Sequence, residues 1–273
     1  MKTIIYKIKG FLDRVTKDHV SAYAAQSAFF LVLSFIPIIL LLLTMIQYTP
    51  VTKADVLNLA YEFFPTSIRS TIISIINEVY RKSQAIIPVT AIVALWSASR
   101  GILAITNGLN CIYDQTETRN YFYLRIRSAG YTLILISVIV FCLVLLGFGN
   151  TISLWVNQHV PVFQYVTDFI IEIRTITIIC ILIIFSLCMY RFLPNNSRKF
   201  KKQIPGAMFT AVGWTLASFV ISVYMDIFRG FSNMYGSLTT IVLIMLWLYF
   251  CMYVMLVGGE LNVCLEEWQI LKK

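Results

Sequence analysis

Residues Leu238 to Val257 read LTTIVLIMLWLYFCMYVMLV, a run of 20 residues without a charged side chain. A helix needs about 20 mainly apolar residues to cross about 30 Å of hydrocarbon, because it rises about 1.5 Å per residue. A membrane β-strand would instead alternate polar and apolar residues over about 10 positions. This stretch therefore predicts a membrane-spanning α-helix.

The composition of the whole chain agrees with this class. Of the 273 residues, 59% are hydrophobic and only 13% are charged. A soluble domain carries about 25% charged residues, which it needs to cover its surface. The composition excludes a soluble globular protein and favours an integral membrane protein.

Six segments are long and apolar enough to span a membrane. They are Ala22–Ile46, Ile86–Ile105, Ala129–Phe148, Thr175–Leu193, Gly206–Phe228 and Leu238–Val257. We predict an all-α bundle of six transmembrane helices that forms a single domain over residues 1–273.

The distribution of Lys and Arg predicts the orientation. The N-terminal arm, the second and fourth loops and the C-terminus carry 15 of these residues, whereas the other three loops carry 6. Because cytoplasmic segments are enriched in Lys and Arg, both termini are predicted to be cytoplasmic. The net charge of +9 is then a topology signal, and basic juxtamembrane clusters attract anionic lipid headgroups rather than nucleic acid.

The first external segment, Gln47 to Ala85, contains a helical pattern. Apolar residues recur at helical spacing after Pro65 and face away from the polar ones; they are Ile68, Ile72, Ile73, Ile75, Ile76, Val79 and Tyr80. The pattern predicts an amphipathic external helix between the first two spans. It lies either in the outer headgroup plane or over a cavity as a lid.

Polar side chains in the second span form a stripe. Arg100 lies about 21 Å from the outer end of the span, hence in its cytoplasmic half. Ser97, Arg100, Asn107 and Asn110 fall within about 140° on a helical wheel. A charged side chain in hydrocarbon costs at least about 2.5 kcal/mol, so Arg100 needs a partner, water or a ligand.

Two other spans carry polar residues at a similar expected depth, namely Gln26 in the first and Glu260 with Asn262 at the end of the sixth. One interpretation is an ion pair between Arg100 and Glu260, with the amides fixing helix register. The other is a cavity open to the cytoplasm in which Arg100 attracts an anionic head group. On the outer side, Asp226 with Arg229, near Tyr235 and Gly236, is expected to form an interfacial pair.

Catalytic and metal signatures are missing from the sequence. His19 and His159 are predicted on opposite sides of the membrane, and there is no P-loop, GxSxG or GxGxxG motif. We therefore expect no catalytic residue, no cofactor and no metal site, and a protein that is not an enzyme.

Several motifs resemble those of the YihY/BrkB membrane protein family. They are AAQSAFFLVLSFIP in the first span, LWSASRGI (Leu95–Ile102) followed by Asn110 and Tyr113, PGAMFTAVGW (Pro205–Trp214), and YGSLTTIVLIMLWLY (Tyr235–Tyr249) ending in GGELN (Gly258–Asn262). The resemblance implies a six-helix protein of the bacterial inner membrane. It places family motif positions at Arg100, Asn110, Tyr235, Gly236 and Glu260.

The family has also carried a ribonuclease BN label, which the residues do not favour. That chemistry needs a His/Asp metal cluster on a soluble scaffold. Two functions stay open. One is a transporter or translocator of an anionic lipid or metabolite. The other is a non-transporting membrane scaffold or envelope-assembly factor. The expected partners are anionic membrane lipids, with a second copy of the chain or envelope-assembly proteins as alternatives.

Overall fold

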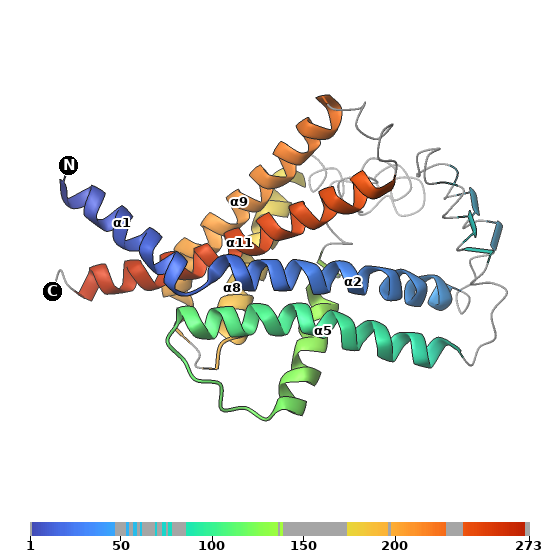
Figure 1. Ribbon diagram of the computed structural model, residues 1–273, viewed down its shortest axis with the longest axis horizontal. Coiled ribbons are helices and arrows are strands. Elements are labelled where there is room, and N and C mark those ends of the chain that lie inside the picture. Colours follow the sequence, from blue (N-terminus) through green and yellow to red (C-terminus); the bar gives the residue numbers. More distant parts are fainter. Residues whose placement is uncertain are drawn as a thin grey trace, which may run out of the picture.

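The computed structural model describes residues 2–46, 86–135, 137–138, 174–195, 198–227 and 237–270, with short pieces between residues 53 and 77. The regular elements in these ranges are all α-helices, which confirms the predicted all-α class. They are α1 (Lys2–Lys17), α2 (Val20–Ile46), α5 (Ile86–Ile112), α8 (Arg174–Phe192), α9 (Phe200–Ile227) and α11 (Ser237–Ile270), shown in Figure 1. Residues 121–135 form a further helix between α5 and α8.

Three of the described helices are long and apolar enough to cross a membrane, at Thr175–Phe192, Phe200–Tyr224 and Ile241–Trp268. They correspond to the last three predicted spans. The first span lies in α2, where Val20–Ser34 is a shorter apolar stretch, and the second lies in α5. Most of the third span and most of the external helix lie outside the described residues, so the six-span count stays a prediction.

The helices extend past the predicted spans. α5 continues to Ile112 instead of ending near Ile105, and α11 continues to Ile270 instead of Val257. α9 begins at Phe200, ahead of the expected Gly206. Hydropathy detects only the apolar part of a helix. Backbone hydrogen bonds extend the helix beyond that part, up to a residue that ends it.

Such a stop signal ends α5. Asp114 adopts a left-handed backbone with φ 50°, the Asp114 N–H donates to the Cys111 carbonyl at 3.1 Å, and the Gln115 N–H donates to the Asn110 carbonyl at 2.8 Å. This pair of bonds is a Schellman motif, which satisfies carbonyls that the helix end leaves free. The chain then turns away from α5 toward residues 121–135.

The N-terminal arm, considered only for its charges in the sequence, is the helix α1. Val15 is buried against the core, while Ile8 and Leu12 are exposed. Arg14 forms an ion pair with Glu267 of α11 at 2.6 Å. The arm is therefore attached to the end of the last helix.

Glycines bring two pairs of helices into close contact. In the hairpin of α2 and α5, Gly101 faces Leu31 and Gly108 faces Tyr23. Between α9 and α11, a side chain added at Gly206 would overlap the Gly258 carbonyl and the Asn262 amide. Small residues allow the two helix backbones to approach this closely. In a membrane the hydrophobic effect does not drive helices together, so close packing of this kind stabilises their association.

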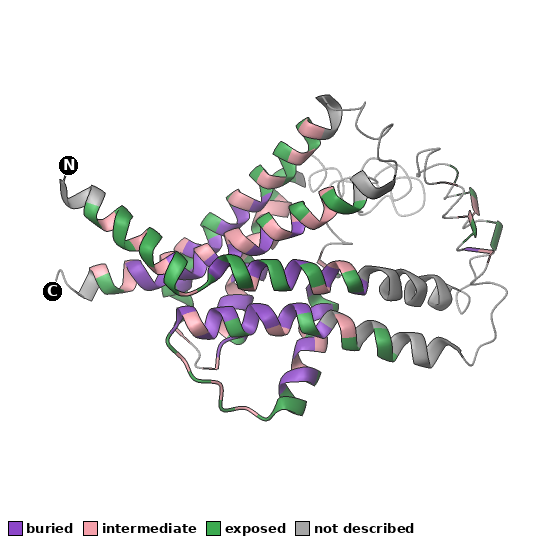
Figure 2. Cartoon of the chain, in the orientation of Figure 1, coloured by how far each residue is buried: buried purple, intermediate pink, exposed green. Residues whose placement is uncertain are grey.

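Four segments meet at one end of the helices, here called the basic end: residues 14–19, 110–120, 191–203 and 260–268. Arg14 reaches Glu267, Asn195 reaches Asn110, and Arg198 reaches Glu266. These are the segments that the Lys and Arg count assigns to the cytoplasm. The buried residues are concentrated toward this end of the described helices (Figure 2).

The close approach of α9 and α11 predicts that Gly206→Ala destabilises the fold. The added methyl must displace backbone atoms of α11, and overpacking of this kind costs about 1–3 kcal/mol. Gly130→Ala is the matched control, because nothing lies within 4 Å of that position. Thermal unfolding in detergent should show a lower midpoint for Gly206→Ala and an unchanged or higher one for Gly130→Ala. Equal midpoints would contradict this packing.

The orientation is open to direct labelling. A cysteine in place of the exposed Lys199, at the basic end, should react only with membrane-permeant thiol reagents in intact cells. A cysteine at Arg69 should react with impermeant reagents. Labelling of position 199 from outside would reverse the topology.

Candidate functional site

A buried hydrogen-bond network links three helices at the basic end. The Tyr113 hydroxyl donates to Gln203 Oε1 at 2.8 Å, and Asn262 Nδ2 donates to the same oxygen at 3.0 Å. The Gly206 N–H donates to Asn262 Oδ1 at 2.7 Å. The network fixes α5, α9 and α11 in register at the point where Gly206 approaches Gly258.

A second buried bond set joins α8 to the same region. The Tyr190 hydroxyl donates to the Met255 carbonyl at 2.6 Å and lies 2.6 Å from the Thr210 hydroxyl. The Tyr190 side chain is fully buried. Four helices are thus joined by side-chain hydrogen bonds within a few turns of one another.

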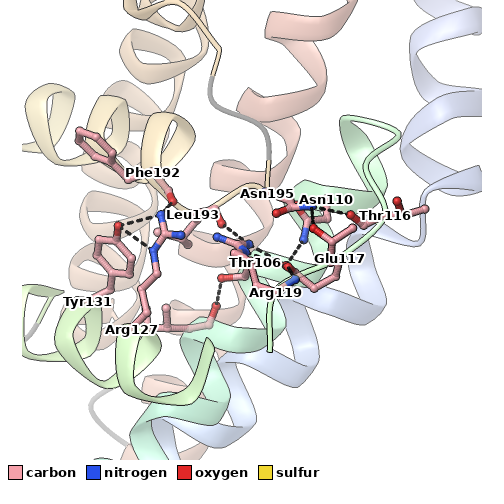
Figure 3. A network of polar contacts seen from close by, with 12 residues as sticks. Thr106, Asn110, Thr116, Glu117, Arg119, Arg127, Tyr131, Phe192, Leu193 and Asn195 are labelled. Atoms are coloured by element: carbon pink, nitrogen blue, oxygen red, sulfur yellow. Dashed lines mark hydrogen bonds and ion pairs between the residues drawn. The ribbon is translucent and has the colours of Figure 1, made fainter. Parts of the chain in front are cut away.

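The loops after α5 and α8 are held together by four polar residues, here called the loop clamp: Asn110, Glu117, Arg119 and Asn195 (Figure 3). Glu117 accepts bonds from Asn110 Nδ2 at 2.8 Å and from Arg119 Nη2 at 2.6 Å. Asn110 Oδ1 accepts from the Asn195 N–H at 2.8 Å, and Arg119 donates to the Leu193 carbonyl at 3.0 Å.

The electrostatics of the loop clamp follow from these contacts. The Arg119 guanidinium, bonded to Glu117 through its side chain, lowers the pKa of the Glu117 carboxyl below its ordinary value. Burial opposes this effect, and the bond from Asn110 adds to it. Glu117 is therefore ionised at neutral pH and acts as the anionic centre of the clamp.

Arg100 lies in a different place, on an exposed face of α5. Its guanidinium carbon stands 5.4 Å from the centroid of the Phe30 ring of α2. Trp96, one turn earlier on α5, is covered by the Arg125 guanidinium at 4.5 Å, and Arg125 also lies 5.5 Å from the Tyr121 ring. We call these five residues the Arg–aromatic row.

The two arginines of the row differ in burial. Arg125 is only 4% exposed and donates to Ser99 Oγ at 3.1 Å and to the Tyr121 hydroxyl at 3.0 Å. Arg100 is exposed. Within the described part of the chain, neither forms an ion pair with a carboxylate. Each guanidinium lies against a ring face, but Arg125 spends donors on Ser99 and Tyr121, so only the exposed Arg100 presents its donor edge to an anion.

The structure separates the predicted site residues into groups. Arg100 and Glu260 form no ion pair among the described residues: Arg100 lies on Phe30, and both carboxylate oxygens of Glu260 are buried without a hydrogen-bond partner. Asn110 belongs to the loop clamp, and Asn262 belongs to the buried network.

The remaining predicted residues lie outside these networks. Gln26 and Asn107 are exposed, and Ser97 is half-buried. Gln26 and Phe30 are four residues apart, as are Trp96 and Arg100, so each pair shares a helix face. Asp226 lies in α9, while Tyr235, Gly236 and Arg229 are outside the described residues.

Several functional candidates were missed in the sequence. Gln203, which lies in α9, and Glu117 fall in segments that were predicted as loops and noted only for Lys and Arg, and Arg125 was counted as a loop charge. A usable signal for Arg125 was its place four residues after Tyr121, which puts the two side chains on one helix face, because aromatic side chains commonly stack on guanidinium groups. No group of three or more His, Cys, Asp or Glu side chains that could hold a metal ion occurs among the described residues.

The apolar helices and their polar cross-links define a helical integral membrane protein. The chain belongs to the BrkB family, since the family described as Virulence factor BrkB matches residues 11–272. The family resemblance predicted from the motifs is confirmed. The description of this family names a virulence factor and no reaction.

Curated relatives agree with this membership. The ribonuclease-like protein YfkH of Bacillus subtilis (strain 168) is 30% identical over 262 residues, which cover 95% of each chain. The UPF0761 membrane protein IL2447 of Idiomarina loihiensis is 26% identical over 171 residues, 61% of this chain and 57% of the relative. A UPF0761 membrane protein of Glaesserella parasuis serovar 5 is 25% identical over 174 residues, 63% of this chain and 58% of the relative. No solved structure matches the chain.

The loop clamp predicts a pH-dependent contribution from Glu117. A carboxyl whose pKa is lowered by folding stabilises the protein above its unfolded pKa, about 4.3 for Glu, and loses this contribution as the pH falls. Glu117→Gln should therefore lower the thermal unfolding midpoint at pH 7, and the difference from wild type should shrink below about pH 4. Asp13→Asn, on the exposed face of α1, is the control and should match wild type at pH 7. A gap that is constant with pH would contradict the ion pair.

Proposed function

We propose that this chain is a translocator of the bacterial inner membrane that moves an anionic lipid or metabolite. In this proposal both termini are cytoplasmic, the moving ligand carries a phosphate group, and the chain itself hydrolyses neither ATP nor RNA. Arg100 contacts the phosphate, with the second arginine of the Arg–aromatic row close by.

The observation that supports the proposal is the exposed position of the Arg100 side chain midway along α5. The side chain is exposed halfway along α5, twelve residues or about 18 Å from the helix end at Ile112. Its aromatic neighbours are Phe30, which lies against the guanidinium, and Trp96, which is exposed one turn earlier on α5. A guanidinium within a membrane span needs an anion or water, and a phosphate supplies both charge and acceptor oxygens.

The Arg–aromatic row also provides two positive charges that could attract a charged group. The Phe30 and Trp96 rings contact the Arg100 and Arg125 guanidinium groups, and no carboxylate of the described chain forms an ion pair with either arginine. An anion can therefore be attracted by two positive charges on the same side of α5. Arg125 comes from residues 121–135, so the site would join two separate segments of the chain.

A membrane scaffold is the second candidate, and the buried network of Tyr113, Gln203 and Asn262 favours it. A transporter must rearrange its helices, whereas these bonds hold α5, α9 and α11 in one register. In this alternative the chain assembles envelope components, with a second copy or another membrane protein as partner.

Proteoliposomes with fluorescent lipids separate the two functions. Wild type should bring labelled phosphatidylglycerol to the outer leaflet, where dithionite quenches it, faster than labelled phosphatidylcholine. Arg100→Gln should slow the phosphatidylglycerol rate about tenfold, because a hydrogen bond to a charged group contributes about 1.5–3 kcal/mol. Arg100→Lys should recover part of the rate, since it keeps the charge but loses the planar fork.

The matched control is Lys201→Gln, which removes an exposed cation away from the row. For a soluble ligand, glycerol 3-phosphate should raise the unfolding midpoint of wild type but not of Arg100→Gln. If neither lipid moves faster than in protein-free vesicles and the phosphate ester has no effect, the translocator is ruled out and the scaffold remains.

A further inference from the structure

The helix α1 has an apolar face of which only one side is covered by protein. Its residues Ile8, Phe11, Leu12 and Val15 fall within about 100° on a helical wheel. Phe11 and Val15 pack against the core, whereas Ile8 and Leu12 are 54% and 57% exposed. Ile8 and Leu12, four residues apart, form an exposed apolar stripe, here called the apolar edge.

Contacts with α11 fix the rotation of α1 about its own axis. Lys7 Nζ lies 4.6 Å from the centroid of the Trp268 ring, and Arg14 Nη1 lies 2.6 Å from Glu267 Oε2. On the helical wheel Lys7 and Arg14 lie more than about 90° from the apolar edge. The apolar edge is therefore the part of α1 that α11 leaves uncovered.

Cations accompany the apolar edge along α1. The helix carries five Lys and Arg residues and one acidic residue, Asp13. Lys9 and Lys17 are exposed, and neither forms an ion pair within the described part of the chain. The exposed surface of α1 thus combines apolar side chains with positive charges that have no acidic partner there.

The position of α1 in the chain brings this surface to the membrane boundary. α1 ends at Lys17, and α2, which contains the first predicted span, begins at Val20. His19 in the connecting turn has a left-handed backbone with φ 51°, and α1 leaves the end of α2 at an angle (Figure 1). In the predicted topology, the headgroups of the cytoplasmic leaflet lie at this turn.

We propose that α1 docks on the anionic cytoplasmic leaflet, with Ile8 and Leu12 inserted at the headgroup boundary and Lys9 and Lys17 bound to lipid phosphates. Amphipathic helices with basic flanks bind membranes in this way. A second copy of α1 does not suit the surface, because it would bring together two helices that each carry five cations and one anion. The inference concerns the attachment of α1 and is independent of translocation by Arg100.

Photo-crosslinking identifies what covers the apolar edge. p-Benzoylphenylalanine is placed at Leu12 of the full chain, which is reconstituted into liposomes of phosphatidylethanolamine and phosphatidylglycerol. Irradiation should add the mass of one lipid to the protein. The matched control carries the same amino acid at Asp13, which is also exposed but lies on the polar side of α1, and it should gain no lipid.

Hydrogen exchange of the wild-type chain tests the part played by charge. Amides of residues 6–17 should exchange at least about fivefold more slowly in phosphatidylglycerol nanodiscs than in phosphatidylcholine nanodiscs, which is the effect of one Lys near an anionic surface. The double variant Lys9→Gln, Lys17→Gln should lose most of this difference. The matched control Lys199→Gln, Lys201→Gln removes two exposed cations from the same end of the protein and should keep it.

Three outcomes would overturn the docking surface. They are equal or absent lipid adducts at positions 12 and 13, a crosslink from position 12 to a second copy of the chain, and the same wild-type exchange in both lipids. The crosslink between copies would make α1 a dimer contact. The exchange comparison uses wild type alone, so it decides the matter even where a variant fails to fold.

Discussion

The close contact of α9 with α11 at Gly206 and Gly258 is the constraint on which the rest of the fold depends. Lipid is as apolar as the side chains it surrounds, so helices in a membrane associate through tight packing and polar bonds. Here both act at one place, since the Gly206 N–H also donates to Asn262. Asn262 bonds to Gln203, and Gln203 bonds to Tyr113, so the contact also positions α5.

Hydropathy predicted the class of fold well because it depends on local composition. The apolar run at Leu238–Val257 lies in α11, and contacts at the basic end join the loops after α5 and α8 and the end of α11. Helix ends were predicted poorly, since α5 stops at a Schellman turn whose Asp114 takes a left-handed backbone. A hydropathy average does not detect such a turn, because it uses residue polarity and not backbone conformation.

The candidate site was predicted only in part, for a physical reason. Burial cost picks out a charged residue such as Arg100 or Glu260, but it does not say which way the side chain points. Because Arg100 and Glu260 were expected at a similar depth in the membrane, an ion pair between them was one interpretation. In the structure Arg100 lies on the surface against Phe30, whereas Glu260 is fully buried. Rotation about the helix axis is set by neighbours such as Gly101 and Gly259, and that requires tertiary packing.

The attachment of α1 to the end of α11 sets the order in which the chain can assemble. Arg14 and Glu267 are 253 positions apart, so their contact cannot form until the ribosome has synthesised the last helix. Contacts between such distant residues form late and slow folding, because a long loop must close first. Until then α1 can pack only against α2, the helix that follows it in the chain. The N-terminal helix therefore reaches its final packing only after the whole of α11 has been synthesised.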